Sequence, residues 1–211
     1  MKIESVHVTY PLFLKINLFD TPAMDKLWEY ISSAKENPES MKWDLAGHVS
    51  NSLTLKDKDN WFFNNICLPT IYEHKVVFEE STGHFNQTLF KKDVNYIMNT
   101  FWVNFQKQHE FNPLHNHSGV FSFVVFMKIP YDWREQHEIP FVKESAIPMA
   151  GNFEFTYTDI NGQIMAFGQS LDPSSEGLML FFPAELYHQV YPFYNCEEER
   201  ITISGNIIYD V

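Results

Sequence analysis

The stretch EGLMLFFPAELYHQVYPF, residues 176–193, places an apolar run, a proline and a histidine close together. The run LMLFF has the composition of a β-strand, and it ends at Pro183 because proline cannot donate a backbone hydrogen bond within a sheet. After a short turn, His188 begins the next extended segment. A buried imidazole needs a hydrogen-bond partner or a metal. We therefore expect a strand, a turn and a second strand that carries a candidate functional histidine.

Five other runs of similar composition lie before and after this stretch, in the part of the chain after about residue 93. They are rich in Phe, Val, Ile and Tyr, and they are separated by Pro, Gly, Asn and Asp. The runs are VNYIMNTFWVNFQ (94–106), VFSFVVFMKIPY (120–131), NFEFTYTDI (152–160), QIMAFGQ (163–169) and RITISGNIIYDV (200–211). Consecutive short strands of this kind predict an antiparallel sandwich or barrel and not alternating βαβ units. The predicted fold class is mainly β with N-terminal helices.

The N-terminal part has a different pattern. Pro22 is a good first residue for a helix, and apolar side chains then recur at intervals of three and four, which predicts an amphipathic helix over about 22–35. The segment 37–90 has no clean period and is expected to hold one or two helices with loops. No Gly/Ser-rich linker divides the chain. We therefore expect a single domain of 211 residues, in which about 1–92 form a helical and extended support region and about 93–211 form the β core.

Composition limits the classes of function. The chain has 15 Lys and Arg against 27 Asp and Glu, a net charge of −12. This excess of acidic residues argues against sequence-independent binding of nucleic-acid phosphates, which needs clustered positive charge. No apolar run approaches the roughly 18 residues of a membrane span, and the first residues lack the features of a signal peptide. With two cysteines far apart, a secreted disulfide scaffold is not indicated. We expect a soluble, cytoplasmic protein.

Two further histidines form the motif HNH. His115 and His117 are two residues apart, so in an extended segment their side chains lie on one face. Antiparallel barrels bring the first and last strands of such a region together, and His188 could then join this pair. Three nitrogen ligands leave open positions on a first-row metal, as a catalytic site requires. The pair alone is also compatible with a hydrogen-bonded structural role.

Arg200 follows His188 by twelve residues and begins an alternating strand, with Thr202 on the same face. A guanidinium that points into a metal-bearing barrel would bind a carboxylate through two parallel hydrogen bonds. Alternatively, Arg200 neutralises the adjacent glutamates 197–199 on the surface.

Together these motifs resemble the 2-oxoglutarate- and iron(II)-dependent oxygenases of bacteria and their viruses, a group with the double-stranded β-helix (jelly-roll, cupin-like) fold. The resemblance covers about residues 100–208. It implies a dioxygenase, in particular a hydroxylase of an unidentified substrate, with Fe(II) as cofactor and 2-oxoglutarate and O2 as cosubstrates. The matching stretches are WVNF (102–105), HNH (115–117), SFVVFMKIP (122–130), EGLMLFFPAELYHQVYP (176–192) and RITISGN (200–206).

The resemblance also implies roles for particular residues. Arg200, helped by Thr202, would bind the distal carboxylate of 2-oxoglutarate, and Asn104 would contact cosubstrate or substrate. His117, the second histidine of HNH, departs from the two-histidine, one-carboxylate triad that is common among non-heme iron oxygenases, because it stands where that triad has its carboxylate. The implied iron ligands are His115, His117 and His188.

Three alternatives remain open at this point. A cupin-type metal enzyme shares the barrel, but the glutamate expected after its HxH motif is absent. A three-histidine zinc hydrolase is chemically possible. The third alternative is a non-catalytic β-sandwich that serves as a binding or viral structural module.

Two smaller predictions concern the rest of the chain. The 20-residue insertion 131–150 is either a lid or binding loop, or a tolerated surface insertion. The remaining isolated histidines have polar neighbours in the sequence, and we expect surface or loop positions for His7, His48, His74, His84 and His137.

Overall fold

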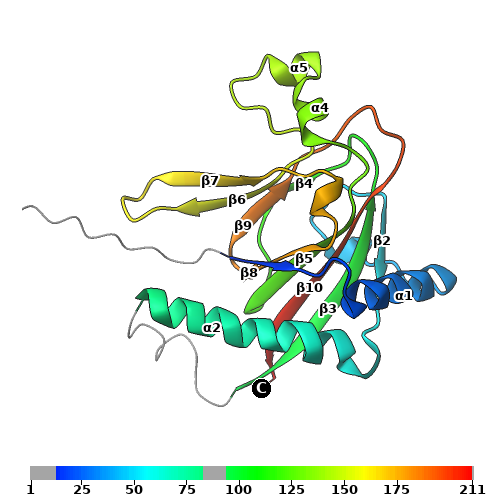
Figure 1. Ribbon diagram of the computed structural model, residues 1–211, viewed down its shortest axis with the longest axis vertical. Helices are drawn as coiled ribbons and strands as arrows, with labels where there is room; N and C mark the ends of the chain where they lie inside the picture. Colours follow the sequence, from blue (N-terminus) through cyan, green and yellow to red (C-terminus); the bar gives the residue numbers. More distant parts are fainter. Residues whose placement is uncertain (1–12, 83–93, 211) are drawn as a thin grey trace, which may run out of the picture.

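The structure, a computed structural model, describes residues 13–82 and 94–210. Its strands form two antiparallel sheets that face each other (Figure 1). The larger sheet consists, in spatial order, of β1 (Leu14–Asn17), β8 (Leu178–Pro183), β5 (Phe121–Lys128), β10 (Arg200–Asp210), β3 (Asn95–Gln106) and β2 (Asn51–Thr54). The smaller sheet consists of β4 (Asn112–His115), β9 (Tyr187–Val190), β6 (Phe153–Thr158) and β7 (Ile164–Gln169). All six runs that the sequence predicted to be extended therefore contribute strands.

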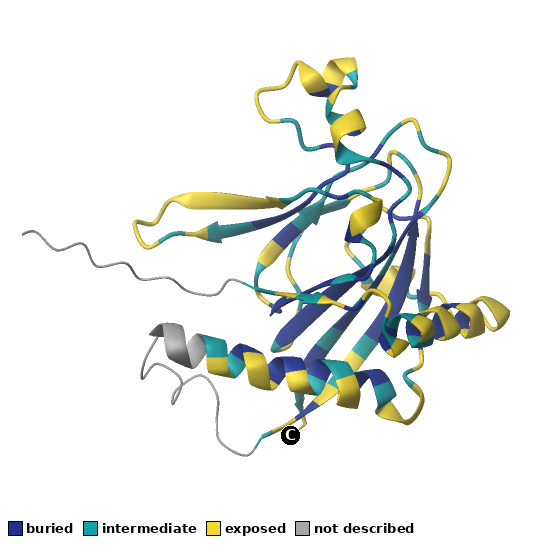
Figure 2. Cartoon of the chain, viewed as in Figure 1, coloured by how far each residue is buried: buried dark blue, intermediate teal, exposed yellow. Residues whose placement is uncertain are grey.

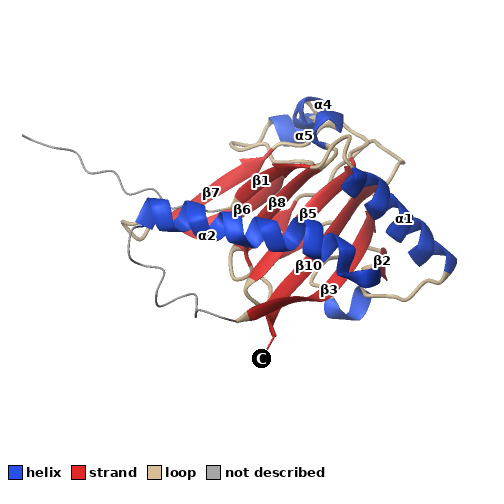
Figure 3. Ribbon diagram, turned by 60° about the horizontal axis from the view of Figure 1, so that its bottom comes forward, coloured by secondary structure: helices blue, strands red, loops and turns tan. Residues whose placement is uncertain are grey.

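Two helices cover the outer face of the larger sheet (Figure 3). α1 (Pro22–Glu36) confirms the helix predicted over 22–35, and it begins with proline in its first turn. α2 (Leu68–Thr82) confirms a helix within the segment 37–90, the last part of which lies outside the described residues. A π-helical turn, η3 (Phe63–Cys67), precedes α2. Short 3-10 turns are η1 (Lys42–Asp44), η2 (Lys58–Asn60) and η4 (Pro173–Ser175).

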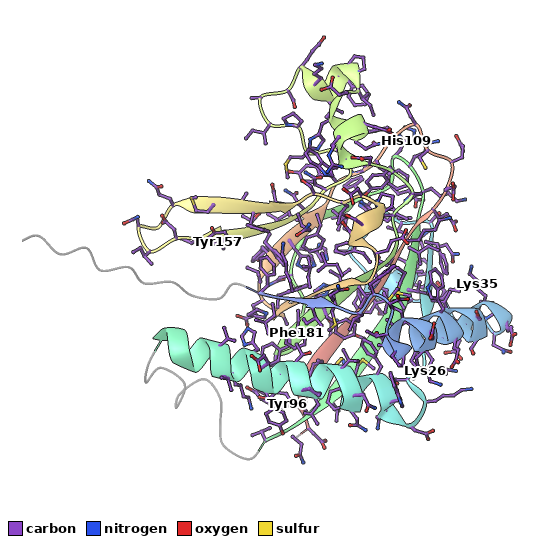
Figure 4. The ribbon with its side chains drawn as sticks, viewed as in Figure 1. Lys26, Lys35, Tyr96, His109, Tyr157 and Phe181 are labelled. Carbon is purple, nitrogen blue, oxygen red and sulfur yellow. The ribbon has the colours of Figure 1, made fainter. Side chains whose placement is uncertain are left out.

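The strand β5 is apolar at nearly every position because both of its faces are covered. Phe123 and Val125 pack into a cluster with α1 and the residues around α2, whereas Val124 and Phe126 pack toward the smaller sheet. The buried band therefore follows the middle of the larger sheet (Figure 2). Phe181 on β8 packs in the layer between the larger sheet and α2 (Figure 4).

His74 contradicts the prediction of a surface or loop position. It lies on α2 with 2 % of its surface exposed, and its ring packs edge-on against Phe121 and Phe181. Burial lowers the pKa of His74 to about 4. The polar neighbours misled the sequence interpretation, because Glu73 is exposed and Lys75 is half-buried with its ammonium over the ring of Tyr96, while the ring of His74 between them is buried. His48 is exposed as predicted, His137 is half-buried in a short helix, and His7 and His84 lie outside the described residues.

The insertion 131–150 folds into two short helices, α4 (Trp133–His137) and α5 (Pro140–Lys143), at one end of the molecule (Figure 1). Gln136 fixes them to the barrel, because its side chain donates to the carbonyl of Tyr194 and accepts from the backbone N–H of Tyr194. The insertion is therefore a docked element with its own hydrogen bonds. Separately, no helix among residues 13–82 and 94–210 is long and apolar enough to cross a membrane.

Candidate active site

Three histidines, two on neighbouring strands and one just after the first of these strands, converge between the sheets. His115 ends β4 and lies opposite His188 on β9 in the antiparallel pairing, while His117 follows in the turn after β4. One ring nitrogen from each histidine lies within 4.8 Å of the others. The Nε2 atoms of His117 and His188 are 3.2 Å apart. The convergence expected from the sequence is therefore present, while binding of iron by these residues stays a prediction.

Backbone carbonyls orient two of the three rings. The Nδ1 of His115 lies 2.7 Å from the carbonyl oxygen of Pro113, and the Nδ1 of His188 lies 3.0 Å from that of Leu186. A carbonyl can only accept, so Nδ1 carries the proton in both rings and Nε2 keeps its lone pair. Such a bond to the other ring nitrogen is the usual support of a metal-binding histidine.

The three imidazoles are neutral at pH 7. Burial lowers the pKa of His115, although its bond to Pro113 opposes the change. Burial, followed by repulsion from His115, lowers the pKa of His117 to about 4. Burial, followed by repulsion from both neighbours, lowers the pKa of His188 well below its usual value. Each ring therefore offers a lone pair and not a positive charge, as binding of a divalent cation requires.

Aromatic rings surround this cluster. Phe153 stacks on the ring of His188 at 5.4 Å, and Phe182 meets the same ring edge-on at 5.0 Å. The ring of Trp102 lies 5.9 Å from that of His117. This apolar shell excludes water from the back of the cluster and holds the rings in place.

The histidines line a cavity of about 390 Å³ that opens to the surface. Arg200, Thr202, Ser204 and Asn206 alternate along β10 and all line it. Asn104 on β3 also lines it, opposite Thr202 in the β10–β3 pairing. The structure therefore places all six residues predicted for the site in one cavity.

Arg200 is fully buried, with no exposed surface. Its guanidinium donates to the side-chain oxygen of Gln106, the hydroxyl of Tyr131, and the carbonyls of Gly151 and Tyr191. All these partners are neutral, and no carboxylate of residues 13–82 and 94–210 forms an ion pair with it. The alternative that Arg200 neutralises surface glutamates is therefore wrong. A buried cation without a counter-charge is costly, so an anion that bound at this end of the cavity would be stabilised by Arg200.

The comparison with protein families agrees with this arrangement. A family model described as "Putative 2OG-Fe(II) oxygenase" matches residues 100–206, which is half of the 211-residue chain. The chain belongs to this family. It is thus an oxidoreductase of the dioxygenase type, with Fe(II) as cofactor and 2-oxoglutarate and O2 as cosubstrates. Membership favours the oxygenase over the cupin-type enzyme, the zinc hydrolase and the non-catalytic module.

A solved structure with a TM-score above 0.5 shows the fold of this oxygenase. The non-heme alpha-ketoglutarate-dependent epimerase SnoN from nogalamycin biosynthesis aligns with 93 % of this chain and 76 % of its own, with a TM-score of 0.51 and 12 % identity. A prolyl-4-hydroxylase from Pseudomonas putida aligns with 92 % of this chain and 90 % of its own, with a TM-score of 0.46 and 13 % identity. No curated protein sequence matches the oxygenase significantly. The predicted double-stranded β-helix is confirmed.

Several polar residues of the oxygenase cavity were missed by the sequence interpretation. Ser52 donates to the side-chain oxygen of Asn104, and the buried Thr100 Oγ1 and Trp102 Nε1 have no protein partner among the described residues. Gln106 lies at the end of β3, the strand that carries Thr100 and Trp102, and it contacts Arg200. The alternation in TFWVNFQ contains the signal, because every second side chain from Thr100 to Gln106 faces the cavity. Nothing local to Ser52 marks it.

Proposed function

We propose that this oxygenase is a hydroxylase, which uses Fe(II), 2-oxoglutarate and O2 to convert a C–H group of a polar substrate to C–OH. The observation that carries the proposal is the shared cavity, in which three neutral imidazoles lie with a buried guanidinium that has no counter-charge. The three neutral imidazoles suit a metal ion, and the guanidinium without a counter-charge suits one carboxylate of a dicarboxylate.

The donor set fits iron. Three imidazole nitrogens with oriented lone pairs bind divalent first-row metals and leave positions open for other ligands. We assign His115, His117 and His188 as the residues that hold Fe(II). When bound, Fe(II) supplies the oxidising chemistry together with O2 and 2-oxoglutarate, and the protein supplies position and a dry cavity.

The other half of the site fits the cosubstrate. Arg200 would bind the distal carboxylate of 2-oxoglutarate through charge-assisted hydrogen bonds. Thr202 and Asn104, which face each other across two paired strands, would donate to or accept from the cosubstrate or substrate. The free donors of Thr100 and Trp102 support a substrate that carries hydrogen-bond acceptors, because burying an unpaired donor is costly. With a net charge of −12, bulk nucleic acid is the least suitable polar substrate.

We infer that the N-terminal part belongs to the same domain as the β core. β1 pairs with β8 and β2 pairs with β3, so strands from both parts share one sheet. The segment 41–49 also contributes to the cavity lining, so this part does more than support the core.

One experiment tests the activity. Purified protein with Fe(II), 2-oxoglutarate and O2 is expected to release succinate, slowly alone and faster with a pool of polar metabolites and peptides. Mass spectrometry of the pool is expected to detect a compound that gains one oxygen atom. Absence of succinate under all these conditions would contradict an oxygenase, whereas succinate with a product other than a hydroxylated one would contradict only the hydroxylase.

His117→Ala and His117→Asp test the unusual third histidine. We expect the alanine variant to lose metal affinity by at least the roughly 10–100-fold seen when a supporting residue of a metal site is removed. We expect the aspartate variant to keep the metal, because an anionic oxygen ligand restores the common triad. Anaerobic Mn(II) titration measures the metal affinity of both variants.

His109→Ala is the matched control, since His109 is exposed and outside the cavity. Equal affinity of both His117 variants and the wild type would remove His117 from the metal site.

A further inference from the structure

We propose that Gln106 caps the carboxylate-binding edge of Arg200, so that 2-oxoglutarate binds by exchanging its distal carboxylate for the Gln106 amide oxygen. Gln106 would then determine the selectivity for an oxo acid that carries a distal carboxylate over one that lacks it. This inference rests on the proposed function, in which Arg200 binds the cosubstrate.

The hydrogen bonds of Arg200 carry the first step. A guanidinium has five N–H donors and binds a carboxylate through two parallel donors on one edge. On one edge of Arg200, Nε and Nη2 both donate to Oε1 of Gln106, at 3.2 and 2.7 Å. Nη1 donates to the Tyr131 hydroxyl and the Gly151 carbonyl, and Nη2 also donates to the Tyr191 carbonyl. Every donor is used, so a carboxylate must replace an acceptor that is already there.

The position of the cavity identifies which acceptor can leave. Gln106 and Arg200 both line the cavity, whereas Tyr131, Gly151 and Tyr191 do not. Two of these three partners contribute backbone carbonyls. The third, Tyr131, is held in place because its hydroxyl donates to Gly151 and its ring stacks on Phe193 at 4.8 Å. A ligand that enters from the cavity therefore meets the Gln106 edge, and only the Gln106 side chain can swing away by rotating its own bonds.

Exchange of the Gln106 amide oxygen for a ligand group is favourable only when the ligand carries a distal carboxylate. A charged acceptor forms hydrogen bonds to a guanidinium that are roughly twice as strong as those of a neutral amide. The Gln106 amide also has a second anchor, because its Nε2 donates to the carbonyl of Glu110. An oxo acid without a distal carboxylate offers nothing that can displace the amide. Gln106 thus stabilises the buried cation and rejects neutral competitors.

The test compares Gln106→Glu and Gln106→Met by calorimetry on the Mn(II)-loaded full chain without oxygen. The probes are 2-oxoglutarate and 2-oxobutyrate, which has the same oxo-acid end but no distal carboxylate. Gln106→Glu places a carboxylate on the Arg200 edge, so we expect 2-oxoglutarate affinity to fall by about tenfold or more while 2-oxobutyrate affinity stays unchanged. Gln106→Met has similar size but no acceptor, so we expect 2-oxoglutarate to bind at least as tightly as in the wild type.

Gln108→Glu is the matched control, because it adds the same charge two residues away on a side chain that contacts Glu197 and not Arg200. Unchanged 2-oxoglutarate affinity in Gln106→Glu would overturn the proposal. Weaker 2-oxoglutarate binding in Gln106→Met would also overturn it, because Gln106 would then support the bound carboxylate and not compete with it. If the proposed function itself were wrong, wild-type protein would bind 2-oxoglutarate no better than 2-oxobutyrate. This result in the wild type is distinct from the two variant results that would overturn the role of Gln106.

Discussion

Replacing His188 by alanine is expected to abolish stoichiometric metal binding. His188 has 4 % of its surface exposed, and its ring contacts both other histidines, with ring centroids 4.3 and 5.0 Å away. Its loss removes one of three nitrogen ligands, and the two that remain come from one short segment. We expect the affinity for Fe(II) or Mn(II) to fall by more than the roughly 10–100-fold that removal of a supporting residue produces. Anaerobic titration with elemental analysis measures the stoichiometry.

His74→Ala provides the control for this variant. His74 is also a buried histidine with a lowered pKa, but it packs on the opposite face of the larger sheet, against Phe121 and Phe181. Both variants remove a buried ring and should lower the thermal midpoint, yet only His188→Ala should lose the metal. Full metal binding by His188→Ala, in protein that is shown to be folded, would contradict the three-histidine site.

Replacing Arg200 by leucine is expected to weaken 2-oxoglutarate binding severely and to leave metal affinity nearly unchanged. Loss of one partner of a buried charged pair typically costs about 2–5 kcal/mol. The buried guanidinium also bridges β10, β3 and the insertion, so Arg200→Leu leaves the Tyr131 hydroxyl and the Tyr191 carbonyl without a donor and leaves the Gly151 carbonyl with the Tyr131 hydroxyl as its donor. A lower thermal midpoint that 2-oxoglutarate no longer raises is therefore the second expected result.

Calorimetry with 2-oxoglutarate at saturating Mn(II) measures the first effect. Arg134→Leu serves as the control, because Arg134 is exposed and, among the acidic groups of the described residues, contacts only Asp132 and Asp172. Removal of the Arg134 guanidinium should change neither the affinity for 2-oxoglutarate nor the affinity for Mn(II). Equal 2-oxoglutarate affinity of Arg200→Leu and the wild type would exclude Arg200 from the cosubstrate site.

The sequence predicted the β core, and it singled out six residues that the structure brings to one cavity, because both depend largely on short-range patterns. A period of two along 200–206 places Arg200 and Thr202 on one face whatever the rest of the chain does. The HNH pair similarly needs only an extended backbone. The approach of His188 followed from antiparallel topology, in which the strands that carry the two motifs are neighbours.

The surroundings of Arg200 could not be predicted in this way. Its partners come from β3, from the first residue of the insertion, and from the loop before β6 and the end of β9. No local pattern brings such distant segments to one side chain. His74 shows the same limit, because its burial depends on how α2 lies on the sheet and not on its own neighbours in the sequence.

The place of β10 in the larger sheet has a consequence for biosynthesis. β10 is the last described strand along the chain, yet it lies between β5 and β3 in the sheet. Gln106 and Arg200, which it brings together, are 94 residues apart. Until the ribosome has made β10, the edges of β3 and β5 that pair with it in the finished sheet have no partner strand, and such apolar edges are prone to aggregation. We therefore expect the barrel to close only after β10 has emerged from the ribosome, with the nascent chain depending on chaperones until then.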